Sequence, residues 1–179
     1  MGWVESPAFF CTGSETARDV AVDYVETAVG SLPDHKFQEY AMAGEEARKL
    51  PASIDNERGF KYLVEVYVDD FISLAIPTSQ QQLIHVAQGL MHGVHDVFPA
   101  NDNDSNDPIS KKKLEKGEGM WDVNKEILGF DFNGADKTMI LGEGRLHFLL
   151  TTLQKWIRTA NNSTAGIPFT EFEPVIAKI

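Results

Sequence analysis

Apolar residues recur along the chain at two spacings, one typical of helices and the other of strands. Over Ala17–Ala28 they lie three or four residues apart, at positions 17, 20, 21, 24, 25 and 28. This spacing puts them on one face of a helix. Ser6-Pro7 is a suitable start, because serine caps helices and proline fits their first turn. Gly30 is a suitable end, and Gly13 is a point where the helix can bend or divide.

The segment 61–76, KYLVEVYVDDFISLAI, has the other spacing. It is rich in β-branched and aromatic residues and carries Asp69-Asp70 at its middle, so it predicts two strands around a tight turn. Ser79 and Gln82 then predict a capping box. They begin a second helix, whose apolar residues stand at positions 83, 86, 87, 90, 91 and 94.

The second half of the chain continues the alternation of hairpin and helix. The polar stretch NDNDSNDP predicts a loop, and the basic run Lys111–Lys113 follows it. A strand over Glu126–Phe132, an Asn133-Gly134 turn of type I′ and a return strand over Thr138–Leu141 are expected next. Leucines and a tryptophan at helical spacing predict a helix over 145–157. This order predicts an α+β fold with helices packed on one face of an antiparallel sheet.

Composition agrees with an ordinary globular domain. The chain has 179 residues, of which 42% are hydrophobic and 24% charged, enough to form a core. No apolar run approaches the roughly 20 residues of a membrane-spanning helix. The first residues lack the basic leader and the apolar stretch of a secretory signal. Cys11 is the single cysteine, so it cannot form a disulfide within the chain. We therefore expect an intracellular protein, cytoplasmic or nuclear, that is neither secreted nor bound to a membrane.

The charge balance restricts how the chain can contact nucleic acid. It has 16 basic and 27 acidic residues, a net charge of −11. Proteins that grip nucleic acid through its phosphates usually carry a basic footprint. A nucleic-acid role must therefore depend on specific residues and not on the overall charge.

Tyr67-Val68-Asp69-Asp70 is the strongest candidate for chemistry. In a straight strand neighbouring side chains point to opposite faces, but a turn can bring both carboxylates toward one point. Adjacent carboxylates repel each other, so the pair favours a hard cation such as Mg²⁺, which binds through one or two carboxylates. Two aspartates also occur in turns for structural reasons alone, and the residues by themselves leave both interpretations open.

Three segments, taken in order, resemble reverse transcriptases, the RNA-directed DNA polymerases of retroelements and retroviruses. They are GWVESPAFF at 2–10, EVYVDDFI at 65–72 and KEILGFDF at 125–132. In that family a G-W-x-x-S-P-x-x-F segment opens a palm helix, Y-x-D-D forms a hairpin, and an L-G or M-G hairpin is the primer grip. The resemblance implies an antiparallel palm sheet within residues 1–141 and the start of a thumb within 142–179.

The resemblance also implies roles for single residues. Asp69 and Asp70 would be two of three catalytic carboxylates that hold Mg²⁺, or Mn²⁺, for nucleotidyl transfer from a dNTP to a primer paired with an RNA or DNA template. Leu128 and Gly129 would be the primer grip. The residues on the nucleotide and template side would be Gly2, Trp3, Ser6, Pro7, Tyr67 and Val68.

The chain departs from the family pattern at both ends. The third catalytic carboxylate and the fingers precede the G-W-x-x-S-P segment in the family, and this chain begins at that segment. The family also has a lysine that donates a proton to pyrophosphate, for which Lys113 and Lys116 are both candidates. We therefore expect a fragment of a retrotransposon reverse transcriptase that polymerises poorly or not at all alone.

Other interpretations remain open. The chain can be a non-catalytic remnant of a palm, or an unrelated α+β interaction domain in which the three motif matches are coincidental. His92 and His95 stand one helical turn apart, but no third metal ligand is evident and structural roles are favoured. Asp102 and Asp104 resemble part of a Ca²⁺ loop that lacks its glycine and its closing glutamate.

Overall fold

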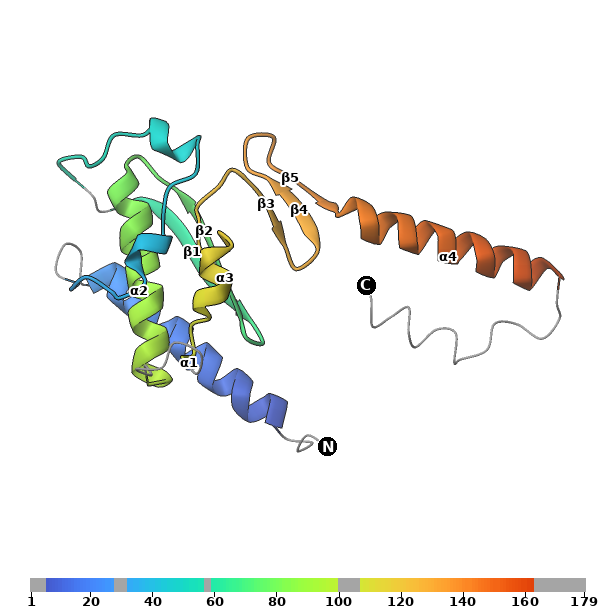
Figure 1. Ribbon diagram of the computed structural model, residues 1–179, viewed down its shortest axis with the longest axis horizontal. Helices are drawn as coiled ribbons and strands as arrows, with labels where there is room; N and C mark the ends of the chain where they lie inside the picture. Colours follow the sequence, from blue (N-terminus) through green and yellow to red (C-terminus); the bar gives the residue numbers. More distant parts are fainter. Residues whose placement is uncertain (1–5, 28–31, 57–58, 100–106, 163–179) are drawn as a thin grey trace. The chain divides into compact units, whose positions relative to one another are not determined.

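The computed structural model confirms the α+β class. It describes residues 6–27, 32–56, 59–99 and 107–162 (Figure 1). Within these ranges the chain forms α-helices and two small antiparallel sheets, one of two strands and one of three. The strands therefore do not join in the single sheet that the sequence predicted. The chain divides into two compact units, Met1–Asp122 (unit 1) and Val123–Ile179 (unit 2), whereas the division expected at 141/142 between palm and thumb stays a prediction.

Two long helices, α1 (Ser6–Thr27) and α2 (Gln80–Val97), pack closely against each other in unit 1. Ala17 and Ala21 of α1 are completely buried. Opposite them, a Cβ at Gly93 of α2 would lie 2.7 Å from the Ala21 nitrogen, so only glycine permits this approach. The predicted apolar stripe of the first helix is thus confirmed. Its predicted last positions, Ala28 and Gly30, lie outside the described residues.

Helix α1 continues without interruption through Gly13, where the sequence allowed a bend. A Cβ at Gly13 would lie 2.9 Å from the ring of Phe98, just beyond the end of α2. The glycine therefore makes room for an aromatic ring and does not break the helix.

The first hairpin is formed by β1 (Lys61–Tyr67) and β2 (Asp70–Ile76), as predicted. Tyr67 pairs with Asp70, so the connecting loop has two residues. One face of the hairpin carries Val64, which packs in a core cluster with Val25 of α1 and Val86 of α2. The helices therefore cover this face, and the opposite face exposes Leu63, Leu74 and Ile76.

A second core cluster holds the remaining segments of unit 1 against α2. Phe37, Ala41, Ala87 and Met91 form it, and Ile109 and Leu114 pack against it. Residues of the 3-10 helix η1 (Gln38–Tyr40) and of the five-residue helix α3 (Lys111–Glu115) pack against it. A second 3-10 helix, η2, spans Ala47–Lys49. Ser79 accepts a hydrogen bond from the Gln82 backbone nitrogen and so caps α2, which confirms the serine half of the predicted capping box.

In unit 2 the second hairpin differs from the one that the sequence predicted. The strand expected over Glu126–Phe132 is two strands, β3 (Asn124–Ile127) and β4 (Phe130–Asn133), which pair around Leu128 and Gly129. Both turn residues have positive φ (52° and 81°), as a type I′ turn requires.

The tight turn predicted at Asn133-Gly134 is wrong. Four residues follow Asn133 before β5 (Thr138–Leu141) begins, and that strand was predicted correctly. The Asn133 side chain accepts a hydrogen bond from the Asp136 backbone nitrogen. An asparagine that bonds to the backbone in this way stabilises a longer connection.

The last described element is α4 (Glu143–Asn162), which contains and extends the predicted helix over 145–157. Part of its apolar surface is exposed within unit 2 at Leu146, Leu150, Leu153 and Ile157. None of the described helices is sufficiently long and apolar to cross a lipid bilayer.

Candidate metal-binding hairpin

The two aspartates lie at the tip of the β1–β2 hairpin. Val68 and Asp69 form the loop, and Asp70 opens β2 directly opposite Tyr67. Tyr67 and Val68 are 62% and 45% exposed, and both aspartates are exposed as well. The tip therefore presents two carboxylates and two large side chains to solvent, which is an accessible arrangement for a cation or a charged ligand.

The backbone at the tip is strained. Val68 has a φ of +59°, a region that β-branched residues rarely adopt because the side chain crowds the backbone. Asparagine or glycine would adopt this conformation at lower cost. Strain of this kind concentrates at functional sites, so the observed outlier supports a functional reading of the tip.

Lys113 of α3 reaches the tip. Its Nζ lies 3.4 Å from Oδ1 of Asp70, in an ion pair whose side chains are about half exposed. Of the two candidate lysines, the structure therefore places Lys113 beside an aspartate, and Lys116 is the C-cap residue of the same helix. Because the pair is exposed to water, it contributes less than about 1 kcal/mol to stability.

The donor set of the tip fits Mg²⁺. Carboxylate oxygens are the ligands that this ion prefers, and it needs only one or two of them because water and phosphate oxygens complete its shell. The position of the Lys113 ammonium shows that Asp70 already pairs with a cation. Within the described part of the chain, however, His, Cys, Asp and Glu residues nowhere form a group of three that could hold a metal ion.

Glu65 lies on the same face of the sheet as Asp70 but has another partner. Its Oε2 accepts a hydrogen bond from Nη1 of Arg18 at 3.1 Å. Hydrogen bonds to Asp19 and Glu65 raise the pKa of Arg18 above its usual value. Arg18 therefore stays charged, and Glu65 is engaged in an ion pair that joins the hairpin to α1.

The turn at Leu128 and Gly129 is fixed by the start of α4. Nη1 of Arg145 donates to the Leu128 carbonyl at 3.1 Å, and the backbone nitrogen of Gly142 donates to the Gly129 carbonyl at 3.0 Å. A Cβ at Gly129 would lie 2.0 Å from Cζ of Arg145. The glycine therefore serves both the positive φ and the close approach of the guanidinium group.

The remaining predicted site residues are not placed by the structure. Gly2 and Trp3 lie outside the described residues, as do Asp102 and Asp104. Ser6 and Pro7 are the first two residues of α1, with only their backbone described. The structure thus brings together one group, which consists of Tyr67, Val68, Asp69, Asp70 and Lys113.

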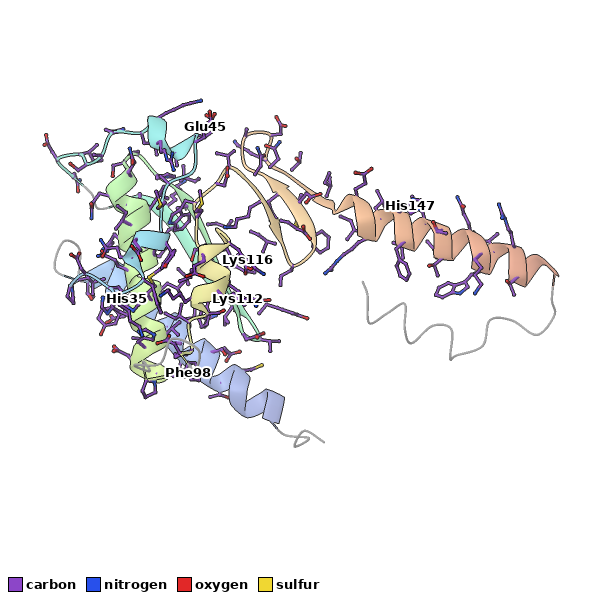
Figure 2. All side chains as sticks on the ribbon, viewed as in Figure 1. His35, Glu45, Phe98, Lys112, Lys116 and His147 are labelled. Atoms are coloured by element: carbon purple, nitrogen blue, oxygen red, sulfur yellow. The ribbon has the colours of Figure 1, made fainter. Side chains whose placement is uncertain are left out.

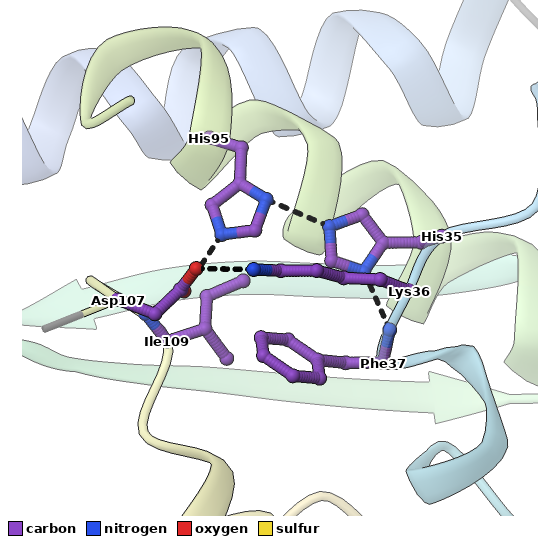
Figure 3. Close-up of polar contacts among 6 residues, drawn as sticks. All are labelled: His35, Lys36, Phe37, His95, Asp107 and Ile109. Carbon is purple, nitrogen blue, oxygen red and sulfur yellow. Dashed lines mark hydrogen bonds and ion pairs between the residues drawn. The ribbon is translucent and has the colours of Figure 1, made fainter. Parts of the chain in front are cut away.

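Two further features were not anticipated. A cavity of about 680 Å³ in unit 1 is lined by residues that include Lys36, Arg48 and Gln80, and the aspartates of the tip are not among its lining residues. A second group joins His35, His95 and Asp107 by hydrogen bonds (Figure 3).

The helical spacing of His92 and His95 allowed a shared role in metal binding, but no third ligand was evident. Nε2 of His92 bonds to the carbonyl of Pro33 and not to His95, and Nε2 of the buried His85 bonds to the carbonyl of Val25. The contact of His92 is consistent with the structural role that the sequence favoured for it.

No family model matches the chain, and comparisons with curated proteins and with solved structures find no match.

Proposed function

We propose that the chain is part of a template-directed nucleotidyl transferase of the reverse transcriptase type. The observation that carries the proposal is the geometry of Tyr67-Val68-Asp69-Asp70. These residues form a hairpin whose loop has two residues, exposes two carboxylates and includes a β-branched residue at a φ of +59°. Ordinary turn chemistry explains the aspartates, whereas a β-branched valine at positive φ is more strained than the leucine at the same position of the β3–β4 loop.

Each residue of the tip then has a defined task. Asp69 and Asp70 supply carboxylates to Mg²⁺ or Mn²⁺, and these ions, when bound, activate a 3′-hydroxyl and stabilise the leaving pyrophosphate. Lys113 keeps a proton on Nζ within 3.4 Å of Asp70. This proton is available to a pyrophosphate oxygen held near the tip. In this proposal Val68, the exposed loop residue before Asp69, lies beside the primer terminus.

The charge distribution supports a nucleic-acid partner for α4. The segment 143–162 contains Arg145, Lys155 and Arg158 but only Glu143 among acidic residues, whereas the whole chain has a net charge of −11. A locally basic helix in an acidic chain is expected where a duplex of template and primer approaches. In this proposal Leu128 and Gly129 contact the primer, and their turn is fixed to the same helix by Arg145.

The described residues supply two carboxylates and not the three of the family. We therefore propose that the chain is a fragment of a retrotransposon enzyme that binds metal and template-primer but extends primers very poorly alone. The alternative is a non-catalytic interaction domain. Exposed apolar residues on the outer face of β1–β2 and on α4 favour it, because such surfaces commonly meet another protein.

A primer-extension assay tests the proposal. A DNA primer labelled with a fluorophore and annealed to an RNA template is incubated with dNTPs, Mg²⁺ or Mn²⁺ and the full chain. Binding is read by fluorescence anisotropy, and extension is read on a gel. The variants are Asp69→Asn and, as a matched control, Asp55→Asn, which removes one charge from another exposed aspartate of unit 1.

The outcomes separate the candidates. Extension that is lost in Asp69→Asn and kept in Asp55→Asn supports catalysis. Metal-dependent binding without extension supports a fragment that keeps the site but lacks a ligand. If the wild-type chain neither binds template-primer nor extends it, the proposed function is wrong and the interaction domain is favoured.

A further inference from the structure

His35, His95 and Asp107 form a continuous chain of hydrogen bonds between three segments of unit 1. Nε2 of His35 lies 2.9 Å from Nδ1 of His95 on α2, and Nε2 of His95 lies 2.9 Å from Oδ1 of Asp107. Figure 3 shows the His95 ring between the other two residues. The contacts join the segment before η1 and the segment before α3 to the last turn of α2.

A backbone amide fixes the direction of this chain. The Phe37 nitrogen donates to Nδ1 of His35 at 3.1 Å, so that ring nitrogen carries no proton and neutral His35 holds its proton on Nε2. His35 therefore donates to Nδ1 of His95, and His95 in turn holds its proton on Nε2 and donates to Asp107. In this arrangement every ring nitrogen of the pair has a partner.

Asp107 anchors the other end. Its side chain is completely buried, and its second oxygen receives the ammonium of Lys36 at 2.6 Å. Its Oδ1 also accepts from the backbone nitrogen of Ile109 at 2.9 Å. A buried carboxylate that loses a hydrogen-bond donor is costly. His95 therefore contributes to holding Asp107 and the start of the segment 107–116 on α2.

A proton added to either histidine is incompatible with this series of hydrogen bonds. If His95 takes it on Nδ1, two N–H groups face each other between His95 and His35. If His35 reverses its tautomer to relieve this contact, its new Nδ1 proton faces the N–H of Phe37. Whichever ring is protonated, one hydrogen bond of the chain is replaced by a repulsion between donors.

The groups around His35 add to this effect. Burial first, and then repulsion by His95, His92 and Lys36, lower the pKa of His35 to about 4, and only Asp107 opposes them. From α1, Tyr24 packs edge-on against His92 and donates to Asp96. Asp96 therefore has Tyr24 as its partner, whereas Asp107 is the carboxylate bonded to His95.

We propose that His35, His95 and Asp107 act as an acid-sensitive latch, which holds the segment 107–116 on α2 at neutral pH and releases it on acidification. The released segment includes α3, so the latch also controls whether Lys113 stays beside Asp70. The latch itself depends only on the contacts of unit 1 and not on the proposed polymerase activity.

The sign of the effect follows from the lowered pKa. In the open form His35 is solvated and titrates near its ordinary value of about 6.5. Above that pH both forms are neutral and the latch is fully stable. As the pH falls from 6.5 toward 4, only the open form takes up the proton, so opening becomes more favourable. Between pH 7.5 and pH 5 the opening equilibrium is expected to rise about 30-fold.

Amide hydrogen exchange of the full chain tests this inference. We expect peptides covering 107–116 to exchange about 30-fold faster at pH 5 than at pH 7.5 after correction for the intrinsic pH dependence of exchange. Peptides from β3 and β4 serve as the internal reference. His35→Gln keeps an N–H donor toward His95 but takes up no proton, so this variant should lose most of the pH dependence. His147→Gln, at an exposed histidine of α4 (Figure 2), is the control and should retain it.

A direct titration covers the case in which His35→Gln does not fold. Histidine side-chain NMR of the wild-type chain should show His35 as the Nε2–H tautomer at pH 7, with a midpoint near 4. A midpoint near 6.5, the other tautomer, or equal corrected exchange of 107–116 at both pH values would each overturn the latch.

Discussion

The two tight hairpins of this protein have loops of equal length that are fastened in different ways. Val68 and Asp69 connect β1 to β2, and Leu128 and Gly129 connect β3 to β4. In each loop the first residue is large, apolar and at positive φ. The β3–β4 loop has glycine second and is held by two hydrogen bonds from Arg145 and Gly142. The β1–β2 loop has aspartate second, and beside it Lys113 makes an exposed ion pair with Asp70.

The comparison distinguishes a turn that is fixed by neighbouring groups of the protein from a turn whose two carboxylates stay exposed. At β3–β4 the second residue is glycine, which adopts positive φ without strain, and neighbouring groups satisfy the loop carbonyls. At β1–β2 the strain is kept and two carboxylates remain exposed, so the loop is less stable than its sequence could make it. We propose that a cation bound by the two carboxylates would stabilise the β1–β2 loop.

The largest effect is expected from Gly129→Ala in the structural turn. Alanine at a φ of +81° adds backbone strain, and its Cβ displaces the Arg145 guanidinium. We expect a loss of roughly 2 kcal/mol in the free energy of opening of β3 and β4, measured by hydrogen exchange. Gly144→Ala is the matched control, because a Cβ there meets no atom within 4 Å and lies in a helix. It should be neutral or slightly stabilising, and equal losses in both variants would contradict the account of this turn.

A smaller effect of opposite sign is expected at the strained tip. Val68→Asn places a residue that tolerates positive φ and should stabilise β1 and β2 by about 1 kcal/mol. Leu128→Asn should give a smaller gain, because leucine is not β-branched and is less strained at φ 52°. Urea unfolding of both variants measures the two gains. If Val68→Asn is destabilising, the strain at the tip is compensated by a contact that the valine makes.

The smallest effect concerns the ammonium beside Asp70. Lys113→Met removes a positive charge 3.4 Å from the carboxylate, so Mn²⁺ should bind the tip a few-fold more tightly while protein stability changes by less than about 1 kcal/mol. Lys112→Met changes the net charge equally from the neighbouring position of α3 and is the control. A similar change in Mn²⁺ affinity for both variants would show that Lys113 has no specific position at the site.

Local patterns predicted much of unit 1 correctly. The hairpin over 61–76 and the stripe of α1 depend on spacings that are complete within short segments, and both are confirmed. The local pattern predicted one strand through Leu128-Gly129, because leucine at positive φ gives no local signal, whereas the resemblance implied an L-G hairpin at this place and β3 and β4 do pair around these two residues. The Asn133-Gly134 pair gave a strong signal, but the Asn133 side chain bonds to Asp136 and opens the connection to four residues.

Contacts between distant residues were not predictable from these patterns. His35 and His95 are 60 positions apart, and Asp107 stands in a stretch that looked like a plain polar loop. The ion pair between Lys113 and Asp70 likewise depends on where α3 packs, so the sequence left Lys113 and Lys116 as equal candidates. Such pairs become visible only when the helices are placed.

The central claim is that the β1–β2 tip holds a divalent cation whereas the β3–β4 turn does not. Paramagnetic broadening by Mn²⁺ tests it directly, because amide NMR signals near the bound ion disappear. With substoichiometric Mn²⁺ we expect signals of residues 67–72 to broaden, those of residues 126–131 to persist, and the broadening to be lost in Asp69→Asn and with excess Mg²⁺. Unchanged signals at 67–72 in millimolar Mn²⁺, or equal broadening at both turns, would contradict the account.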